Sequence, residues 1–362
     1  GGKRIDLGYE KPGGTLSARR HGLTFPINVY PLFENAIRGY KNHSIDKHLK
    51  YLGNMFEPFT KVASENKNAW FPIYRSAEEI STPNEKNRFI GFPYTKYMNA
   101  IMEVDQSASL IIMSEKKANE YSVPKSKRIY LHGCADINEV WNITERPELF
   151  RSSAIRLMGE KAFSMANWNV DEIDYFDLYS CFPSMVELGR EALDISSNIS
   201  SPLTVTGGLP FFGGPGNNYV THSIATMMEK LRNNQNSKGL CTSNGWYATK
   251  HGIGLYSNIP FEGKWEREDP NNYQKIIDNS SKPEVDECPK GNAKIETYTV
   301  ANGRSGPQMA IVIGRLNSNN KRFIATSNNE KILDIMMSDE CLGRDCEVKT
   351  NSEGYNTFSI KI

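Results

Sequence analysis

Three segments of the chain combine residue types that could do chemistry. The first is residues 177–183 (DLYSCFP), where Cys181 lies between an apolar run and a proline that opens a predicted helix. A helix N-terminus favours a thiolate, so we expect this position to lower the pKa of the thiol. The alternative is that Cys181 is a small buried apolar residue, the commonest fate of a free cysteine.

The second segment is a glycine-rich loop, residues 206–218 (TGGLPFFGGPGNN). Its glycines indicate backbone with positive φ or a close approach to a neighbour. The loop precedes a predicted helix, so its amides could hold an anion or an oxyanion. It matches neither a Walker loop nor a dinucleotide-binding loop, so a nucleotide phosphate is not indicated.

The third segment is residues 241–254 (CTSNGWYATKHGIG), where Asn244 and Gly245 predict a tight turn after a strand. His251 could act as an acid or a base, because its ordinary pKa lies near neutral pH. The alternative is a hydrogen-bonded structural histidine. The sequence leaves both open.

Strands and helices alternate around these segments. Predicted strands lie at 107–113, 129–134, 174–179, 239–243 and 253–257, and predicted helices at 115–121, 151–166, 183–193 and 219–231. The run at 107–113 (SASLIIM) is continuously apolar, as expected for a strand buried on both faces. The alternation predicts a layered α/β sheet whose ligands lie at the carboxyl ends of strands.

The flanking regions differ from this pattern. Residues 20–100 predict helices at 30–40 and 44–65 in a loop-rich excursion with no sheet of its own, and Pro58 is expected to kink or break the second helix. Residues 1–25 are predicted to form a loop.

The end of the chain predicts a small β-barrel of OB type. A charged linker leads into short alternating strands separated by turn signals, at 295–300, 308–313, 322–325 and 346–349. The strands carry no set of stacking aromatics and the region is not strongly basic. A packing or interaction module is therefore favoured over nucleic-acid binding.

Composition excludes several classes of function. The 43 basic and 42 acidic residues give a net charge of +1, so nothing indicates nucleic acid or an anionic membrane as a partner. No apolar run is long enough to span a bilayer. The six cysteines form no CxxC pair, which favours reduced thiols in a cytoplasm, and no metal site is expected. The chain opens with neither a Met nor an apolar leader, so we expect a truncated or processed protein.

Together the three segments resemble the C-terminal half of the thiolase family. Residues 179–182 (YSCF) are similar to the motif that reads histidine-aspartate-cysteine-phenylalanine in the sterol-carrier-type branch. Residues 213–215 (GGP) are similar to the glycine-histidine-proline loop, and residues 244–245 to the cysteine-x-glycine loop. The resemblance covers about 15–362 and is strongest to the thiolase-like proteins of type 1, often labelled acetyl-CoA acetyltransferases, which carry an extra C-terminal β-domain.

The resemblance implies a division into three parts. Residues 1–104 correspond to the loop domain and a remnant of the N-terminal domain. Residues 105–257 form the C-terminal α/β domain, in which 105–122 supply the closing strand and helix of the N-terminal sheet. Residues 258–362 form the linker and the added barrel. The expected fold is thus a layered αβαβα thiolase-like fold, incomplete at its N-terminus, followed by an OB-like barrel.

The resemblance also implies roles for particular residues. Cys181 falls on a cysteine used as acid or base, and Tyr179 on a residue that helps form an oxyanion hole. Asn244 falls on a cysteine and Gly214 on a histidine, so both of those groups are replaced. His251 and His222 are the nearby histidines that could substitute.

The same resemblance implies that coenzyme A or an acyl-CoA is the substrate, with no cofactor held covalently. The backbone that would contact it belongs to Gly207, Gly208, Gly213, Gly214 and Pro215. The family's nucleophilic cysteine lies in a part absent from this chain, so a preceding segment or a second chain is an expected partner. Three functions remain open: an acyl-CoA acyltransferase, impaired in this chain; a CoA-binding protein with little or no turnover; and an interaction scaffold.

Overall fold

Two β-sheets organise the described part of this chain, which a computed structural model covers at residues 11–199 and 201–361. The smaller sheet has the order β3 (Tyr130–Asn138), β6 (Lys250–Ser257), β5 (Lys238–Gly245) and β4 (Tyr175–Asp177). The first three strands pair antiparallel, whereas β4 pairs parallel to β5. The parallel pair needs a crossover, which the helices between β4 and β5 supply.

Helices cover both faces of this sheet. Successive residues of β5 point to opposite faces, and Leu240 and Cys241 accordingly belong to two different apolar clusters. Helices α6 (Ser153–Ala166) and α7 (Pro183–Ala192) contribute to the Leu240 cluster, and α8 (Tyr219–Asn233) contributes to the Cys241 cluster. The predicted layered α/β arrangement is confirmed.

Helices α2 (Pro26–Tyr40) and α3 (Ile45–Glu65) form where the sequence predicts helices. The expected break at Pro58 is wrong, because α3 runs through it. A proline inside a helix costs about 3 kcal/mol, but each large apolar side chain that is buried contributes about 1.5–3 kcal/mol. Several residues of α3 are buried, among them Leu52 and Phe56, so packing outweighs the missing hydrogen bond.

The C-terminal sheet closes into a barrel. Its five strands follow the spatial order β7 (Gly291–Gly303), β8 (Gly306–Leu316), β9 (Arg322–Ser327), β11 (Asn356–Ile360) and β10 (Asp345–Thr350), and β10 pairs back to β7. Helix α10 (Glu330–Ser338) lies between β9 and β10 in the sequence. The OB-like barrel is confirmed, although β11 and α10 were not predicted.

Two short strands from the first hundred residues extend the barrel's sheet. These are β1 (Phe89–Gly91) and β2 (Tyr94–Thr95), and β1 pairs with β7 through Gly91 and Ala301. The sequence analysis predicted no strand in this region, because two- and three-residue strands carry no visible periodicity. Three further short helices are α1 (Leu16–Arg20), α4 (Ala77–Ser81) and, inside the predicted linker, α9 (Pro270–Asp278). The predicted loop over residues 1–25 is wrong at α1, where Thr15 caps the helix by accepting from the amide of Ala18. Residues 1–10 of that prediction lie outside the described residues.

The predicted buried strand at 107–113 is wrong. Residues 101–114 contain no strand, and they lead directly into α5 (Glu115–Glu120). Ile111 and Ile112 are 87% and 90% exposed. A strand needs neighbouring strands to satisfy its backbone amides and carbonyls, and both described sheets are completed by other segments. The apolar composition therefore predicted burial that the described part of the chain does not provide.

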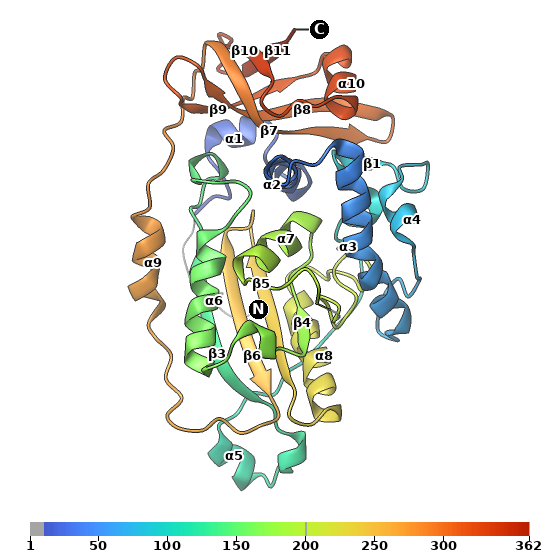
Figure 1. Cartoon of the computed structure of the whole chain (residues 1–362), viewed down its shortest axis with the longest axis vertical. Helices are drawn as coiled ribbons and strands as arrows, with labels where there is room; N and C mark the ends of the chain where they lie inside the picture. Colours follow the sequence, from blue (N-terminus) through green and yellow to red (C-terminus); the bar gives the residue numbers. More distant parts are fainter. Residues whose placement is uncertain (1–10, 200, 362) are drawn as a thin grey trace, which may run out of the picture.

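Helix α2 lies between the barrel and the smaller sheet, so that the two are stacked along the long axis of the molecule (Figure 1). On the barrel side, the amide of Asn35 donates to the carbonyl oxygen of Tyr298 at 2.8 Å. The guanidinium of Arg38 donates to a carboxylate oxygen of Glu340 at 2.9 Å. On the other side, α2 packs against α7.

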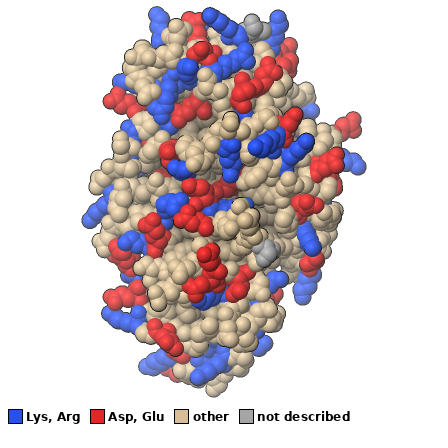
Figure 2. All heavy atoms as spheres, in the orientation of Figure 1, with Lys and Arg blue, Asp and Glu red and all other residues tan. Residues whose placement is uncertain are grey.

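The surface shows mixed charge. Basic and acidic side chains are interspersed over the face seen in Figure 2, without a large area of one sign. Among the described residues, we find no helix with the length and apolar character needed to cross a membrane.

We predict that replacing both Ile111 and Ile112 with lysine reduces self-association of the chain. These two side chains are almost fully exposed on backbone without strand partners, and such apolar segments promote association. Light scattering over a concentration series measures the effect. The control is Ile276→Lys, an exposed apolar residue on α9. Equal effects of the two changes would contradict the prediction.

Candidate active site around Cys181

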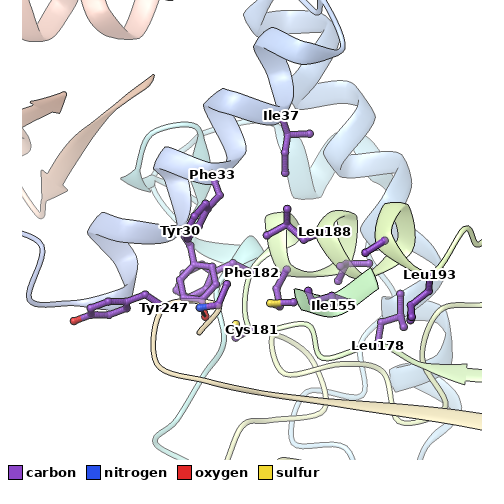
Figure 3. Packing of buried hydrophobic residues seen from close by; sticks show 14 of the residues in the cluster. Tyr30, Phe33, Ile37, Ile155, Leu178, Cys181, Phe182, Leu188, Leu193 and Tyr247 are labelled. Carbon is purple, nitrogen blue, oxygen red and sulfur yellow. Dashed lines mark hydrogen bonds between the residues drawn. The ribbon is translucent and has the colours of Figure 1, made fainter. Parts of the chain in front are cut away.

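Cys181 lies in the short connection between β4 and α7. Phe182 is the N-cap of α7 and Pro183 its first residue, as the sequence predicted. The ring of Phe182 stacks on Tyr30 at a centroid distance of 4.5 Å and on Tyr94 at 5.7 Å. Figure 3 shows Tyr30, Phe182 and Cys181 together beneath α2. Only 8% of the surface of Cys181 is exposed.

Two polar side chains, those of Asn244 and Tyr30, converge on this cysteine. The amide nitrogen of Asn244 lies 3.9 Å from the sulfur of Cys181, and it donates to the hydroxyl of Tyr30 at 2.7 Å. That hydroxyl also accepts from the backbone amide of Ala248 at 3.0 Å and donates to the carbonyl of Trp246 at 2.8 Å. The sequence predicts that Cys181 and Asn244 lie at one site. It gives no sign of Tyr30, which is one aromatic residue on a predicted helix.

Burial determines the ionisation of Cys181. Burial raises the pKa of its thiol to about 12, and the nearby hydroxyl of Tyr30 and the amide of Phe182 only partly oppose that rise. The expected lowering of the pKa by the start of α7 is wrong, because the loss of water outweighs the helix dipole. At neutral pH the group is therefore a thiol that can donate a proton, and not a thiolate nucleophile.

Tyr179 lies two residues before Cys181 and is half-buried. Its backbone amide donates to the hydroxyl of Thr242 at 2.8 Å, and its ring meets Tyr219 edge-on at 5.7 Å. Burial, and next the neighbouring Cys181, raise the pKa of the phenol. Tyr179 is thus a neutral hydrogen-bond donor beside the thiol, and its role in an oxyanion hole stays a prediction.

His251 takes part in a different set of contacts. Its Nε2 lies 3.1 Å from the carbonyl oxygen of Ala248. Burial lowers the pKa of the imidazole to about 4, with Glu139 and Arg146 as its charged neighbours. These contacts favour the structural alternative. His222 is likewise buried, with its Nε2 3.3 Å from the side-chain amide of Asn218.

A buried carboxylate anchors the glycine-rich loop to β4. Asp177, the last residue of β4, accepts hydrogen bonds from the hydroxyls of Thr204 and Tyr219, each at 3.0 Å. It also accepts from the backbone amide of Val205 at 3.0 Å. The loop therefore begins at a fixed position beside β4, the strand that leads into the cysteine segment.

The glycines of the loop are required by its packing. Gly207, Gly208 and Gly213 have φ values of 113°, 77° and 115°, which L side chains rarely adopt. A Cβ at position 207 would lie 2.5 Å from the Cβ of Ala63 on α3, and one at position 208 would lie 2.7 Å from the hydroxyl of Ser180. The loop is thus held tightly between α3 and the cysteine segment.

Three of the loop amides already have partners in this conformation. Those of Gly207 and Gly208 donate to the hydroxyls of Thr204 and Thr206, both at 3.0 Å. That of Gly214 donates to the carbonyl of Ile101 at 2.8 Å, and Pro215 has no amide to donate. A role for these residues in holding CoA stays a prediction, and it would require the loop to open.

The layered sheet, the cysteine segment and the glycine loop together define a thiolase-like protein. The structure is similar to that of a monomeric SCP2-thiolase like protein type 1 from Mycobacterium smegmatis, with a TM-score of 0.90 and 33% identity over 97% of this chain and 76% of that one. The chain therefore belongs to the family of SCP2-thiolase-like proteins of type 1. Residues 272–353 match the family model described as the thiolase-like protein type 1 additional C-terminal domain.

More distant similarities agree with this fold. An acetyl-CoA acetyltransferase of Methanocaldococcus jannaschii is 25% identical over 120 residues, which are 33% of this chain and 29% of that protein. The alignment thus spans less than a third of this curated relative. The structure titled Ltp2-ChsH2(DUF35) aldolase has a TM-score of 0.56 at 17% identity, covers 70% of each chain, and supports the fold alone.

We predict that Tyr30→Phe lowers the free energy of unfolding by about 1–3 kcal/mol, because it leaves the buried amide of Ala248 without its partner and removes the bonds to Asn244 and Trp246. The hydroxyl of Tyr30 bonds to Asn244, Ala248 and Trp246. Urea denaturation followed by circular dichroism measures the change. The control is Tyr121→Phe, at a tyrosine that is 72% exposed, which should shift stability by less than about 0.5 kcal/mol. Equal shifts would show that the Tyr30 network carries no stability.

We predict that Cys181 resists alkylation in the folded protein at pH 7–9, since burial holds the pKa of its thiol near 12 and reactivity requires the thiolate. Cys288 is exposed and provides the internal control. Peptide mass spectrometry after iodoacetamide treatment should find Cys288 modified and Cys181 modified only after unfolding. Equal modification rates for the two thiols would contradict the proposed ionisation state.

Proposed function

We propose that this chain binds an acyl-CoA at Cys181 without itself becoming acylated. The observation that carries the proposal is the neutral, buried thiol of Cys181 beside the amide of Asn244 and the hydroxyl of Tyr30. A protonated thiol and an amide are hydrogen-bond donors, and a thioester oxygen is an acceptor. Neither group is a nucleophile in this state.

A neutral thiol at Cys181 can donate a proton but is a poor nucleophile. In a thiolase-type reaction Cys181 could return a proton to a carbanion at the α-carbon, because a donor with a raised pKa keeps its proton until a stronger base appears. It could not attack a thioester at neutral pH without a base to remove that proton. His251 is held by a backbone carbonyl, and burial lowers the pKa of its imidazole to about 4, so its contacts do not supply that base to Cys181.

Access to the thiol requires local movement. Cys181 is 8% exposed, whereas Asn244 and Tyr179 beside it are partly exposed. Trp246 and Ala248 have positive φ values of 54° and 49° in the turn between β5 and β6. Their backbone groups bond to the hydroxyl of Tyr30, which ties this turn to the residues around Cys181.

A second candidate function is acyl transfer, which the similarity to an acetyl-CoA acetyltransferase favours. In that case the thioester carbon would pass from the CoA sulfur to the sulfur of Cys181, and the thiol proton would pass to the departing CoA thiolate. The relative's activity belongs to a protein of which the alignment covers 29%. The two candidates differ in whether a covalent acetyl group remains on the chain.

We predict that acetyl-CoA binds in calorimetry and leaves no acetyl group on the protein in intact-mass spectrometry. Asn244→Ala should weaken binding about tenfold, which corresponds to the loss of one hydrogen bond of about 1.4 kcal/mol. Cys288→Ser, at an exposed thiol, is the control and should leave affinity unchanged.

Two other outcomes would contradict this prediction. One acetyl group mapped to Cys181 would select the acyltransferase. No heat with either CoA or acetyl-CoA would overturn both candidates and leave the interaction scaffold as the function to test.

A further inference from the structure

A second polar cluster is buried between three helices, apart from the cysteine site. Glu34 on α2 and His48 on α3 are 0% exposed, and Glu187 on α7 is 5% exposed. One ligand atom from each of these side chains lies within 4.8 Å of the other two. The sequence analysis predicted no metal site and passed over all three residues, which are far apart in the chain.

Glu187 is the unexplained member of the cluster. Both oxygens of its carboxyl group are buried, and neither has a hydrogen-bond partner of good geometry in the part of the chain that the structure describes. The polar groups that act on this carboxyl are the carboxyl of Glu34 and the hydroxyl of Tyr51. The ammonium group of Lys41, an exposed residue, lies 3.6 Å from one oxygen. A buried carboxylate with so little compensation is costly. The carboxyl of Glu34 adds to the effect of burial in raising the pKa of Glu187.

The imidazole of His48 is oriented towards the carboxyl groups. Its Nε2 lies 2.6 Å from Oε1 of Glu34, and its Nδ1 lies 3.3 Å from Nδ1 of His43. If Nδ1 of His48 carries the proton and donates it to His43, then Nε2 holds a lone pair facing the cluster. The short contact then requires a proton on Glu34, and burial does raise the pKa of that carboxyl.

The second oxygen of Glu34 is also fixed. The hydroxyl of Tyr94 donates to Oε2 of Glu34 at 2.8 Å, and the same hydroxyl bonds to Ser184 at 2.7 Å. Hydrogen bonds of this kind orient the ligands of a metal, and the contact of His48 with His43 is of the same type. The cluster therefore has both inward-facing ligand atoms and an outer layer that holds them.

We propose that Glu34, His48 and Glu187 bind one divalent transition-metal ion, of which Zn²⁺ is the probe of choice. One imidazole nitrogen with two carboxylates suits zinc and its neighbours better than Mg²⁺ or Ca²⁺, which prefer all-oxygen sites. The two carboxylates balance the charge of the ion. Glu34 and His48 then separate, because two ligands on one tetrahedral zinc lie about 3.3 Å apart.

Such an ion would connect the helices that frame the cysteine site. Helix α2 carries Tyr30, and α7 begins two residues after Cys181. The ion would fasten both helices to α3 through the three ligands. The inference does not depend on the proposed acyl-CoA site, because none of the three residues bonds to Cys181, Asn244 or the hydroxyl of Tyr30 among the contacts of the described residues.

The test is calorimetric titration of chelator-treated, dialysed full chain with ZnCl₂ at pH 7. We expect one tight site per chain, because one ligand atom from each of the three side chains lies within 4.8 Å of the other two. Excess Zn²⁺ should also raise the thermal midpoint of unfolding, as for any ligand of the native state.

Variants locate the site. Glu187→Gln keeps the shape of the side chain and replaces a carboxyl that can become a charged ligand with a neutral amide, so it should fold as stably as the parent in chelator and bind Zn²⁺ at least tenfold more weakly. His132→Gln is the matched control: this buried histidine bonds to the carbonyl of residue 259, outside the cluster. It should leave zinc affinity unchanged.

Two results would overturn the proposal. One is the absence of tight zinc binding to the folded parent chain. The other is tight binding that Glu187→Gln leaves intact, which would place the ion at another site such as the cysteines.

Discussion

The burial of helix α2 on nearly all of its sides is the constraint on which the rest of the structure depends. Nine of its residues are buried, including the polar Glu34, Asn35 and Arg38. A helix enclosed in this way must find a partner for every polar side chain, since an unpaired buried polar group costs about 1–3 kcal/mol. Asn35 and Arg38 find theirs in the barrel, so the barrel is attached by the same helix that supplies Tyr30 to the cysteine site.

Burial also decides the chemistry at both polar clusters. At Cys181 it favours the neutral thiol over the thiolate that the helix start would otherwise support. At Glu34 and Glu187 it favours neutral carboxyls over carboxylates. Loss of water acts in the same direction on each acid, and only a strong opposing charge reverses it. A nearby cation or metal ion would therefore change the ionisation of Glu34 and Glu187 more than small movements of the chain would.

Packing accounts for the glycine loop but not for the apolar segment at 107–113. That segment has the composition of an interior strand, yet it is exposed without strand partners among the described residues. The glycine loop, in contrast, has the tight packing against α3 that its glycines require.

The sequence by itself determined the helices at 30–40, 151–166 and 219–231 and the OB-like barrel, because periodicity and turn residues act over a few neighbours. Its motifs also predicted that Cys181, Asn244 and the glycine loop lie at one site. Only the tertiary structure decided that Tyr30 meets Asn244 from 214 positions away, and that Glu34, His48 and Glu187 share one buried space. Local pattern carries no information on such contacts, and burial, which sets the pKa of each group, exists only once distant segments have packed.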